Sequence, residues 1–122
     1  MADKDLQRLA EVIDDGRVLS GKRAAEAAAA ITERVAPAKR AGITPSAFLD
    51  TDEMILIVDH ALPGWSITID GVASERDGHW VCVLRNSGGR DNDAFVGIGK
   101  CPRLPHAILS ALLKALAFMK PD

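Results

Sequence analysis

The sequence predicts an α+β fold, with N-terminal helices, a small antiparallel three-stranded sheet and a C-terminal helix packed on the sheet. Three observations predict it: helical periodicity in the N-terminal half, alternating apolar and polar residues after it, and a last apolar helix that opens at Pro105. The chain has 122 residues, which suffice for one hydrophobic core. We therefore expect a single domain over 1–122, with a helical segment and basic connector over 1–42 and an α-β-β-β-α core over 43–122.

The N-terminal segment predicts two helices. The first, over 4–15, is amphipathic, because apolar residues recur at the spacing of one helix face. These residues are Leu6, Leu9, Ala10 and Ile13. The second helix, over 22–35, is rich in alanine, whose small side chain allows close packing on a neighbour. Pro37 ends this helix and leaves a basic connector up to Gly42.

The next helix is the ambiguous element of the sequence. The run over 54–58 contains β-branched residues and also suits a buried strand. Thr44-Pro45 and the acidic stretch from Asp50 to Glu53 are typical of helix starts, and acidic residues are favourable near a helix N-terminus. These caps favour a helix over 54–61, which Leu62-Pro63-Gly64 ends.

A hairpin follows this helix. Apolar residues alternate with polar ones over 65–70 and over 79–85, and Asp77-Gly78 marks the turn. We expect these pairs on one face of the hairpin: Trp65 with Leu84, Ile67 with Cys82, and Ile69 with Trp80. Both tryptophans then belong to the core rather than to a stacking platform for a ligand. A short third strand is predicted over 94–99.

The last helix, over 105–120, is apolar on more than one side. Its polar stripe is limited to His106, Ser110 and Lys114. A surface helix needs only one apolar stripe, so this helix is either central to the fold or part of a subunit interface. For the second case, Leu113 and Phe118 are the candidate contact residues.

Charge gives no general attraction to nucleic acid or to an anionic membrane, since the net charge is −2. Basic residues nevertheless gather between Arg17 and Arg40, where Arg34, Lys39 and Arg40 are candidates for contact with phosphate or an acidic partner. A solvated helix face is the simpler interpretation of this segment. No apolar run approaches the roughly 20 residues of a membrane span. The N-terminus carries no secretory signal, so we expect a cytoplasmic protein.

Residue types that carry chemistry are present, but their spacing argues against a site. His79-x-x-Cys82 and Cys101-x4-His106 supply zinc ligand types, yet positions 79 and 82 point to opposite faces of a strand. The segment from Gly97 to Lys100 is similar to part of a phosphate-binding loop but continues into Cys101-Pro102. No nucleophile elbow is found. We expect no catalytic residue, no metal and no cofactor, and an enzyme is the less favoured interpretation.

A set of motifs between Asp52 and Met119 carries a family resemblance. The set contains Asp52-Glu53-Met54, Ile57-Val58, Ala61-Leu62-Pro63-Gly64-Trp65, Ile67, Trp80, Gly97 and an Ala/Leu helix from Pro105 to Leu116. It resembles a loose family of small uncharacterised phage and prophage proteins, described as α-β-α sandwich proteins. The resemblance implies a helix over 54–61 and implies no catalytic residue.

Two functional hypotheses follow from the sequence. The first is a non-enzymatic protein-interaction or assembly module of prophage type that forms a homo-oligomer or binds another protein, because the last helix has surplus apolar surface. The alternative is a nucleic-acid-binding accessory protein. A helix, three strands and a terminal helix follow the element order of double-stranded-RNA-binding domains, although the last helix begins with few basic residues.

Overall fold

The computed structural model describes residues 3–15, 21–35, 42–72, 79–85 and 96–118. Within these residues the elements follow in this order: α1 (Asp3–Asp14), α2 (Gly21–Glu33), the 3-10 helix η2 (Pro45–Leu49), α3 (Thr51–Ala61), β1 (Ser66–Val72), β2 (His79–Arg85), β3 (Val96–Cys101) and α4 (Leu104–Phe118).

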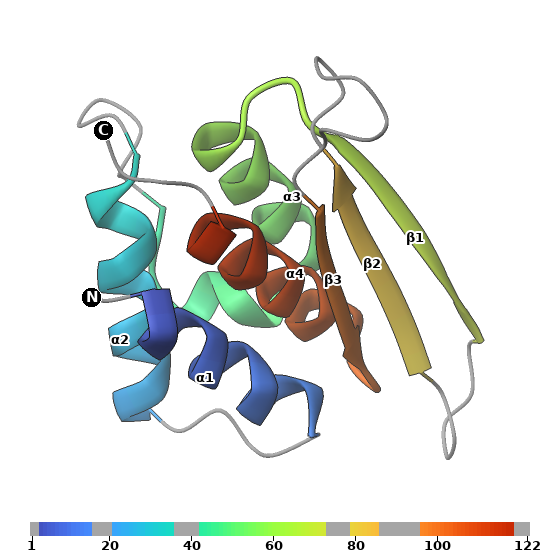
Figure 1. Ribbon diagram of the computed structural model, residues 1–122, viewed down its shortest axis with the longest axis horizontal. Coiled ribbons are helices and arrows are strands. Elements are labelled where there is room, and N and C mark those ends of the chain that lie inside the picture. The colour runs from blue at the N-terminus through green and yellow to red at the C-terminus, as the bar shows by residue number, and fades with distance from the viewer. Residues whose placement is uncertain (1–2, 16–20, 36–41, 73–78, 86–95, 119–122) are drawn as a thin grey trace.

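The described elements form two layers, with all helices on one face of an antiparallel sheet of order β1-β2-β3 (Figure 1). Helix α4 packs against β3 and β2, while α1 and α3 pack on α4. The opposite face of the sheet is covered by no described helix (Figure 1). The predicted α+β class, with the C-terminal helix on the sheet, is confirmed.

Helix α4 is the centre of the core. Its apolar residues face α1, α3 and the sheet at once, which accounts for the surplus of apolar positions. Leu113 is 0% exposed, so it packs inside its own chain and presents no surface to a partner. The side chain of Phe118 lies outside the described residues. Leu113 therefore gives no support to a homo-oligomer formed through this helix.

The pairing of β1 with β2 differs from the predicted register by two residues. Ile67 lies opposite Leu84, Ile69 opposite Cys82, and Gly71 opposite Trp80. The even shift keeps every side chain on its predicted face. The reason lies at Gly71, where a Cβ would overlap the Trp80 ring. Gly71 therefore leaves space for the indole ring, whereas the predicted register would have placed the Ile69 side chain there.

Two glycines allow α4 to approach β3 closely. A Cβ on Gly97 would overlap the carbonyl oxygen of Ala111, and a Cβ on Gly99 would overlap that of Ala107. Strand β3 ends at Cys101 rather than at the predicted residue 99, which extends this contact along the helix.

The α3 region is helical, as the caps predict. The Asp50 carboxylate accepts a hydrogen bond from the Glu53 amide at 3.1 Å, which satisfies one free donor of the first turn. The chain then reverses at Leu62-Pro63-Gly64-Trp65, where the Trp65 amide donates to the Leu62 carbonyl at 3.2 Å. Gly64 has a φ of 83°, which a type II turn requires at its third residue. This turn places β1 beside α3.

Candidate functional site

Helix α3 is apolar on two sides. Met54, Ile57 and Val58 are buried and hold the helix on the core. A second stripe at the spacing i, i+3, i+4, i+7 faces solvent and consists of Asp52, Ile55, Leu56 and Asp59. Leu56 is 52% exposed and Ile55 is 38% exposed. The exposed stripe is therefore an apolar pair with a carboxylate at each end.

Strand β1 is the neighbouring element and is poorly covered. Helix α4 packs on β2 and β3, so the inner face of β1 lies beyond the central helix. Ile69 belongs to the predicted inner face but remains 37% exposed. Val72, on the outer face at the strand end, is 56% exposed. Ile67 and Trp65 are partly buried against the core. The predicted inner face is therefore only partly covered at Ile69.

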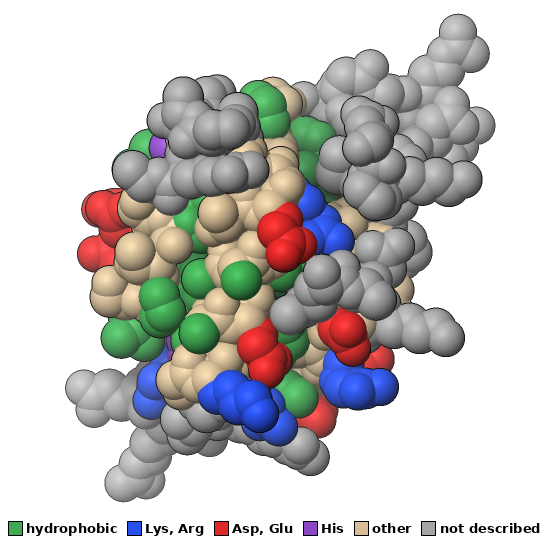
Figure 2. Space-filling view, turned by 90° about the vertical axis from the view of Figure 1, so that its left-hand side faces the viewer, with side chains coloured by type: hydrophobic (Ala, Val, Ile, Leu, Met, Phe, Trp, Pro, Cys, Tyr) green, Lys and Arg blue, Asp and Glu red, His purple; other side chains and the backbone are tan. Residues whose placement is uncertain are grey.

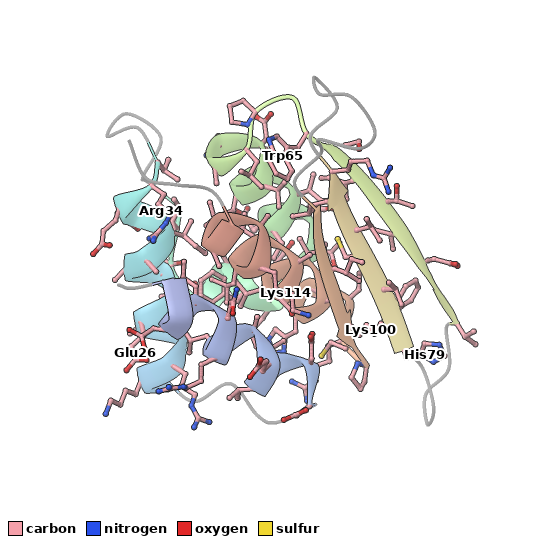
Figure 3. All side chains as sticks on the ribbon, in the orientation of Figure 1. Glu26, Arg34, Trp65, His79, Lys100 and Lys114 are labelled. Atoms are coloured by element: carbon pink, nitrogen blue, oxygen red, sulfur yellow. The ribbon has the colours of Figure 1, made fainter. Side chains whose placement is uncertain are left out.

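A groove of about 320 Å³ separates α3 from β1. It is lined by Ile55, Leu56, Val58, Asp59, Leu62, Gly64, Trp65 and Ile67. Trp65, at the connection from α3 to β1, is one of these lining residues (Figure 3). We call α3, β1 and this groove the α3–β1 face.

The two edges of the sheet differ in their backbone hydrogen bonding. At β3, the Lys100 amide donates to the Asp14 carboxylate at 3.0 Å, and the Lys114 ammonium donates to the Ile98 carbonyl at 2.6 Å. Lys114 also pairs with Asp14, which ties α1, α4 and β3 together. At β1, no described group other than β2 hydrogen bonds the strand backbone. One edge is therefore occupied, while β1 is open among the described residues.

The α3–β1 face carries charge of one sign. Between residues 50 and 72 there are five carboxylates and no Lys or Arg. The carboxylates are Asp50, Asp52, Glu53, Asp59 and Asp70. This face therefore attracts cationic groups and repels anionic ones, an effect that salt reduces.

The basic residues predicted as contacts do not join this face. Arg34 follows α2, on the side of the molecule away from the sheet (Figure 3). Its guanidinium donates to the Ala30 carbonyl at 2.9 Å and lies 3.9 Å from the Glu33 carboxylate. Lys39 and Arg40 lie outside the described residues.

A second hollow lies between α1 and α2 and has mixed charge. It measures about 410 Å³ and is lined by Asp5, Arg8, Leu9, Val12, Arg23 and Glu26. Figure 2 shows acidic and basic side chains next to one another on this side of the molecule. Neighbouring charges of opposite sign compensate each other, so this hollow has no net attraction for an anionic ligand such as a phosphate.

The cysteines and histidines of the sequence motifs have different environments. Cys82 and Cys101 are buried, and burial raises the pKa of both thiols, that of Cys82 to about 11. Protonated thiols are poor nucleophiles and poor metal ligands. His79 is exposed at the end of the sheet opposite Trp65 (Figure 3). Among the described residues, no three His, Cys, Asp or Glu side chains are grouped to hold a metal ion.

His106 is buried at the start of α4. Its Nε2 atom has no hydrogen-bond partner among the described groups. Burial lowers the pKa of the imidazole, and the nearby Arg103 charge lowers it further.

None of the described helices is long and apolar enough to cross a membrane.

The residues that distinguish the α3–β1 face were not predicted as a site. Ile55, Leu56 and Asp59 were assigned only to a helix, and Ile69 to the core. A signal is nevertheless present, because a helix over 54–61 has apolar residues on two faces. Helix α3, like the last helix, has more apolar residues than the single stripe that a surface helix needs.

Comparison of the chain with protein-family models, with curated proteins and with solved structures finds no match.

Proposed function

We propose that the protein is a non-enzymatic protein-interaction module that holds its partner on the α3–β1 face. The observation that carries the proposal is the groove between α3 and β1, which the exposed Leu56 lines. Ile69, two residues along β1 from the lining residue Ile67, is also exposed. Contiguous exposed apolar side chains beside polar ones are typical of protein interaction sites. In this proposal α4 organises the core and makes no contact with the partner.

Removing the exposed apolar side chains of this face from water would stabilise the contact with a partner. Leu56, Ile55 and Ile69 keep between 37% and 52% of their surfaces in water. Complete burial of a Leu or Ile side chain contributes about 1.5–3 kcal/mol, so covering the remainder of each contributes about 1 kcal/mol. Three such side chains at the centre of a contact offset part of the entropy lost on association.

Nucleic acid is a less favoured partner for this face. The order α3–β1–β2–β3–α4 is the element order of double-stranded-RNA-binding domains. The carboxylates of the α3–β1 face would repel phosphate, because nucleic-acid affinity depends on Lys and Arg contacts. The prophage setting and the cytoplasmic location come from the sequence and complete the proposal.

The test is capture of partners from a host lysate by the tagged chain, with and without nuclease, read by mass spectrometry. Three forms are compared: the unaltered chain, Leu56→Lys on the α3–β1 face, and Ile98→Lys on the uncovered face of the sheet. Ile98 is 43% exposed and is therefore a matched control for loss of apolar surface. Circular dichroism confirms that each variant is folded.

The proposal expects nuclease-resistant partners that are lost with Leu56→Lys and kept with Ile98→Lys. Partners that survive Leu56→Lys, or that disappear only with Ile98→Lys, would contradict the α3–β1 face as the site. Partners that disappear with nuclease would favour the nucleic-acid alternative, and salt-dependent binding to Arg34, Lys39 and Arg40 would then be the next test.

A further inference from the structure

We propose that the α3–β1 face binds an extended protein segment whose apolar residues are flanked by Lys or Arg, and that this segment adds to β1 as a fourth strand. This inference rests on the proposed function and specifies the chemistry of the partner. It follows from three properties of the face: an open backbone edge, an apolar groove beside that edge, and carboxylates around both.

The backbone of β1 is suited to pairing. Among the described residues, strand β1 hydrogen bonds with β2 on one side only, so alternate N–H and C=O groups point away from the sheet. Natural edge strands are protected by lysine, proline, bulges or covering elements. The β1 sequence SITIDGV contains no lysine and no proline, and its ladder with β2 is unbroken over seven pairs. The β3 edge, in contrast, is occupied by Asp14 and Lys114.

The side chains beside this edge set the apolar requirement. In an added strand, alternate side chains would point toward the helix layer. There they would meet the groove lined by Leu56 and Ile67, and the exposed Ile69 on the same face of β1. A groove of about 320 Å³ accommodates a small number of side chains. Because strand pairing at β1 requires an extended backbone, we expect a segment with apolar residues at alternate positions.

The carboxylates set the charge of the partner and disfavour a second copy of the chain. Asp52 and Asp59 lie at the two ends of the apolar stripe on α3, and Asp70 lies on the outer face of β1. A two-fold pairing of identical faces would bring these carboxylates together, since such an interface places the same patch on both sides. Lys or Arg residues that flank the apolar positions would meet opposite charge instead.

The experiment selects peptides on the immobilised full chain from a random library of about ten residues, a length that spans one strand. Enriched peptides are synthesised and their affinities measured by fluorescence anisotropy against four forms of the chain. The forms are the unaltered chain, Leu56→Lys, Asp59→Asn, and Glu11→Gln on α1 as the charge control. Each peptide is also made with alternate backbone amides methylated, in the two possible alternating sets.

The inference expects enriched peptides with alternating apolar residues and flanking Lys or Arg. Leu56→Lys should weaken binding at least about tenfold and Asp59→Asn by about threefold, while Glu11→Gln has no effect. One methylated set should abolish binding and the other should not, because only one row of amides faces β1.

Four outcomes would overturn the inference. Peptides that depend on Leu56 but lack basic residues, or tolerate both methylated sets, would leave the α3–β1 face in place and exclude cationic strand addition. A library that yields no peptide dependent on Leu56 would also exclude strand addition by a cationic segment. If lysate partners still depend on Leu56 in that case, the proposed function stands without this inference. Dimerisation abolished by Leu56→Lys would make a second copy the occupant.

Discussion

His106 is the buried side chain whose chemistry conflicts most with its surroundings. Its Nε2 atom is buried without a hydrogen-bond partner among the described groups, and burial followed by the Arg103 charge lowers the imidazole pKa. The sequence placed His106 in the polar stripe of the last helix, beside Ser110 and Lys114. Ser110 and Lys114 both bond Asp14, but no described residue offers Nε2 a partner. Spacing predicted the stripe and could not predict which member would lack a partner.

The lowered pKa of the buried His106 predicts that the stability of the fold depends on pH. The ordinary pKa is 6.5 and the folded value is lower, so the unfolded chain binds the proton first as the pH falls. Stability from this group is therefore complete above about pH 6.5 and is lost below it, with a slope of at most about 1.4 kcal/mol per pH unit. Urea denaturation at about pH 7.5 and about pH 5.5 should show this loss. The His106→Leu variant should lose less unfolding free energy between these two pH values. An equal loss in the variant and the unaltered chain would contradict His106 as the group responsible.

At the scale of elements, the contact between β3 and α4 depends on glycine. Gly99→Ala should lower the free energy of unfolding by about 1–3 kcal/mol or more, because the new Cβ overlaps the Ala107 carbonyl. Gly21→Ala is the matched control, since Gly21 has open space around its Cβ position. That change should be neutral or stabilising by up to about 1 kcal/mol. Equal effects of the two variants in urea denaturation would refute the close contact.

The docking of α1 gives a second prediction at this scale. Asp14 accepts hydrogen bonds from Ser110 at 2.6 Å and from the Lys100 amide, and pairs with Lys114. Asp14→Ala should destabilise the chain by about 1–3 kcal/mol, since it leaves these donors without their acceptor. The neighbouring Asp15 is exposed, so Asp15→Ala should change stability by less than about 0.5 kcal/mol. Thermal denaturation of both variants tests the difference.

The elements also show what sequence can predict and why. Helix α3 followed from its caps, and the faces of β1 and β2 followed from alternation, because both are local properties. The strand register did not, because it depends on the contact between Gly71 and Trp80, which lie on different strands and meet only once the strands pair. The exposure of Ile69 was missed for a related reason. Alternation indicates which face a residue is on, but only the position of α4 decides how far that face is covered.

At the scale of the whole molecule, one continuous core includes residues of α1, α2, α3, the sheet and α4. The helices cover β2 and β3 more fully than β1, and this asymmetry creates the α3–β1 face (Figure 1). The homo-oligomer expected from the sequence assumed that the last helix carried exposed apolar surface. The structure places Leu113 in the core and leaves apolar surface on α3 and β1 instead.

The charge of the α3–β1 face predicts that the isolated chain is monomeric near neutral pH. Pairing two copies through this face would bring like charges together, and high salt would reduce that repulsion. Sedimentation velocity over a range of concentrations should therefore show a monomer at low salt. A dimer at low salt that is abolished by Leu56→Lys would contradict the role of the carboxylates.

Hydrogen exchange at β1 tests the central claim most directly. Amides of residues 66–72 are measured by mass spectrometry in the free chain and after mixing with an enriched library peptide or a captured partner. Strand addition predicts that the β1 amides not bonded to β2 exchange rapidly in the free chain and become protected in the complex. Protection confined to α2 or β3, with β1 unchanged, would contradict the assignment of the α3–β1 face as the binding site.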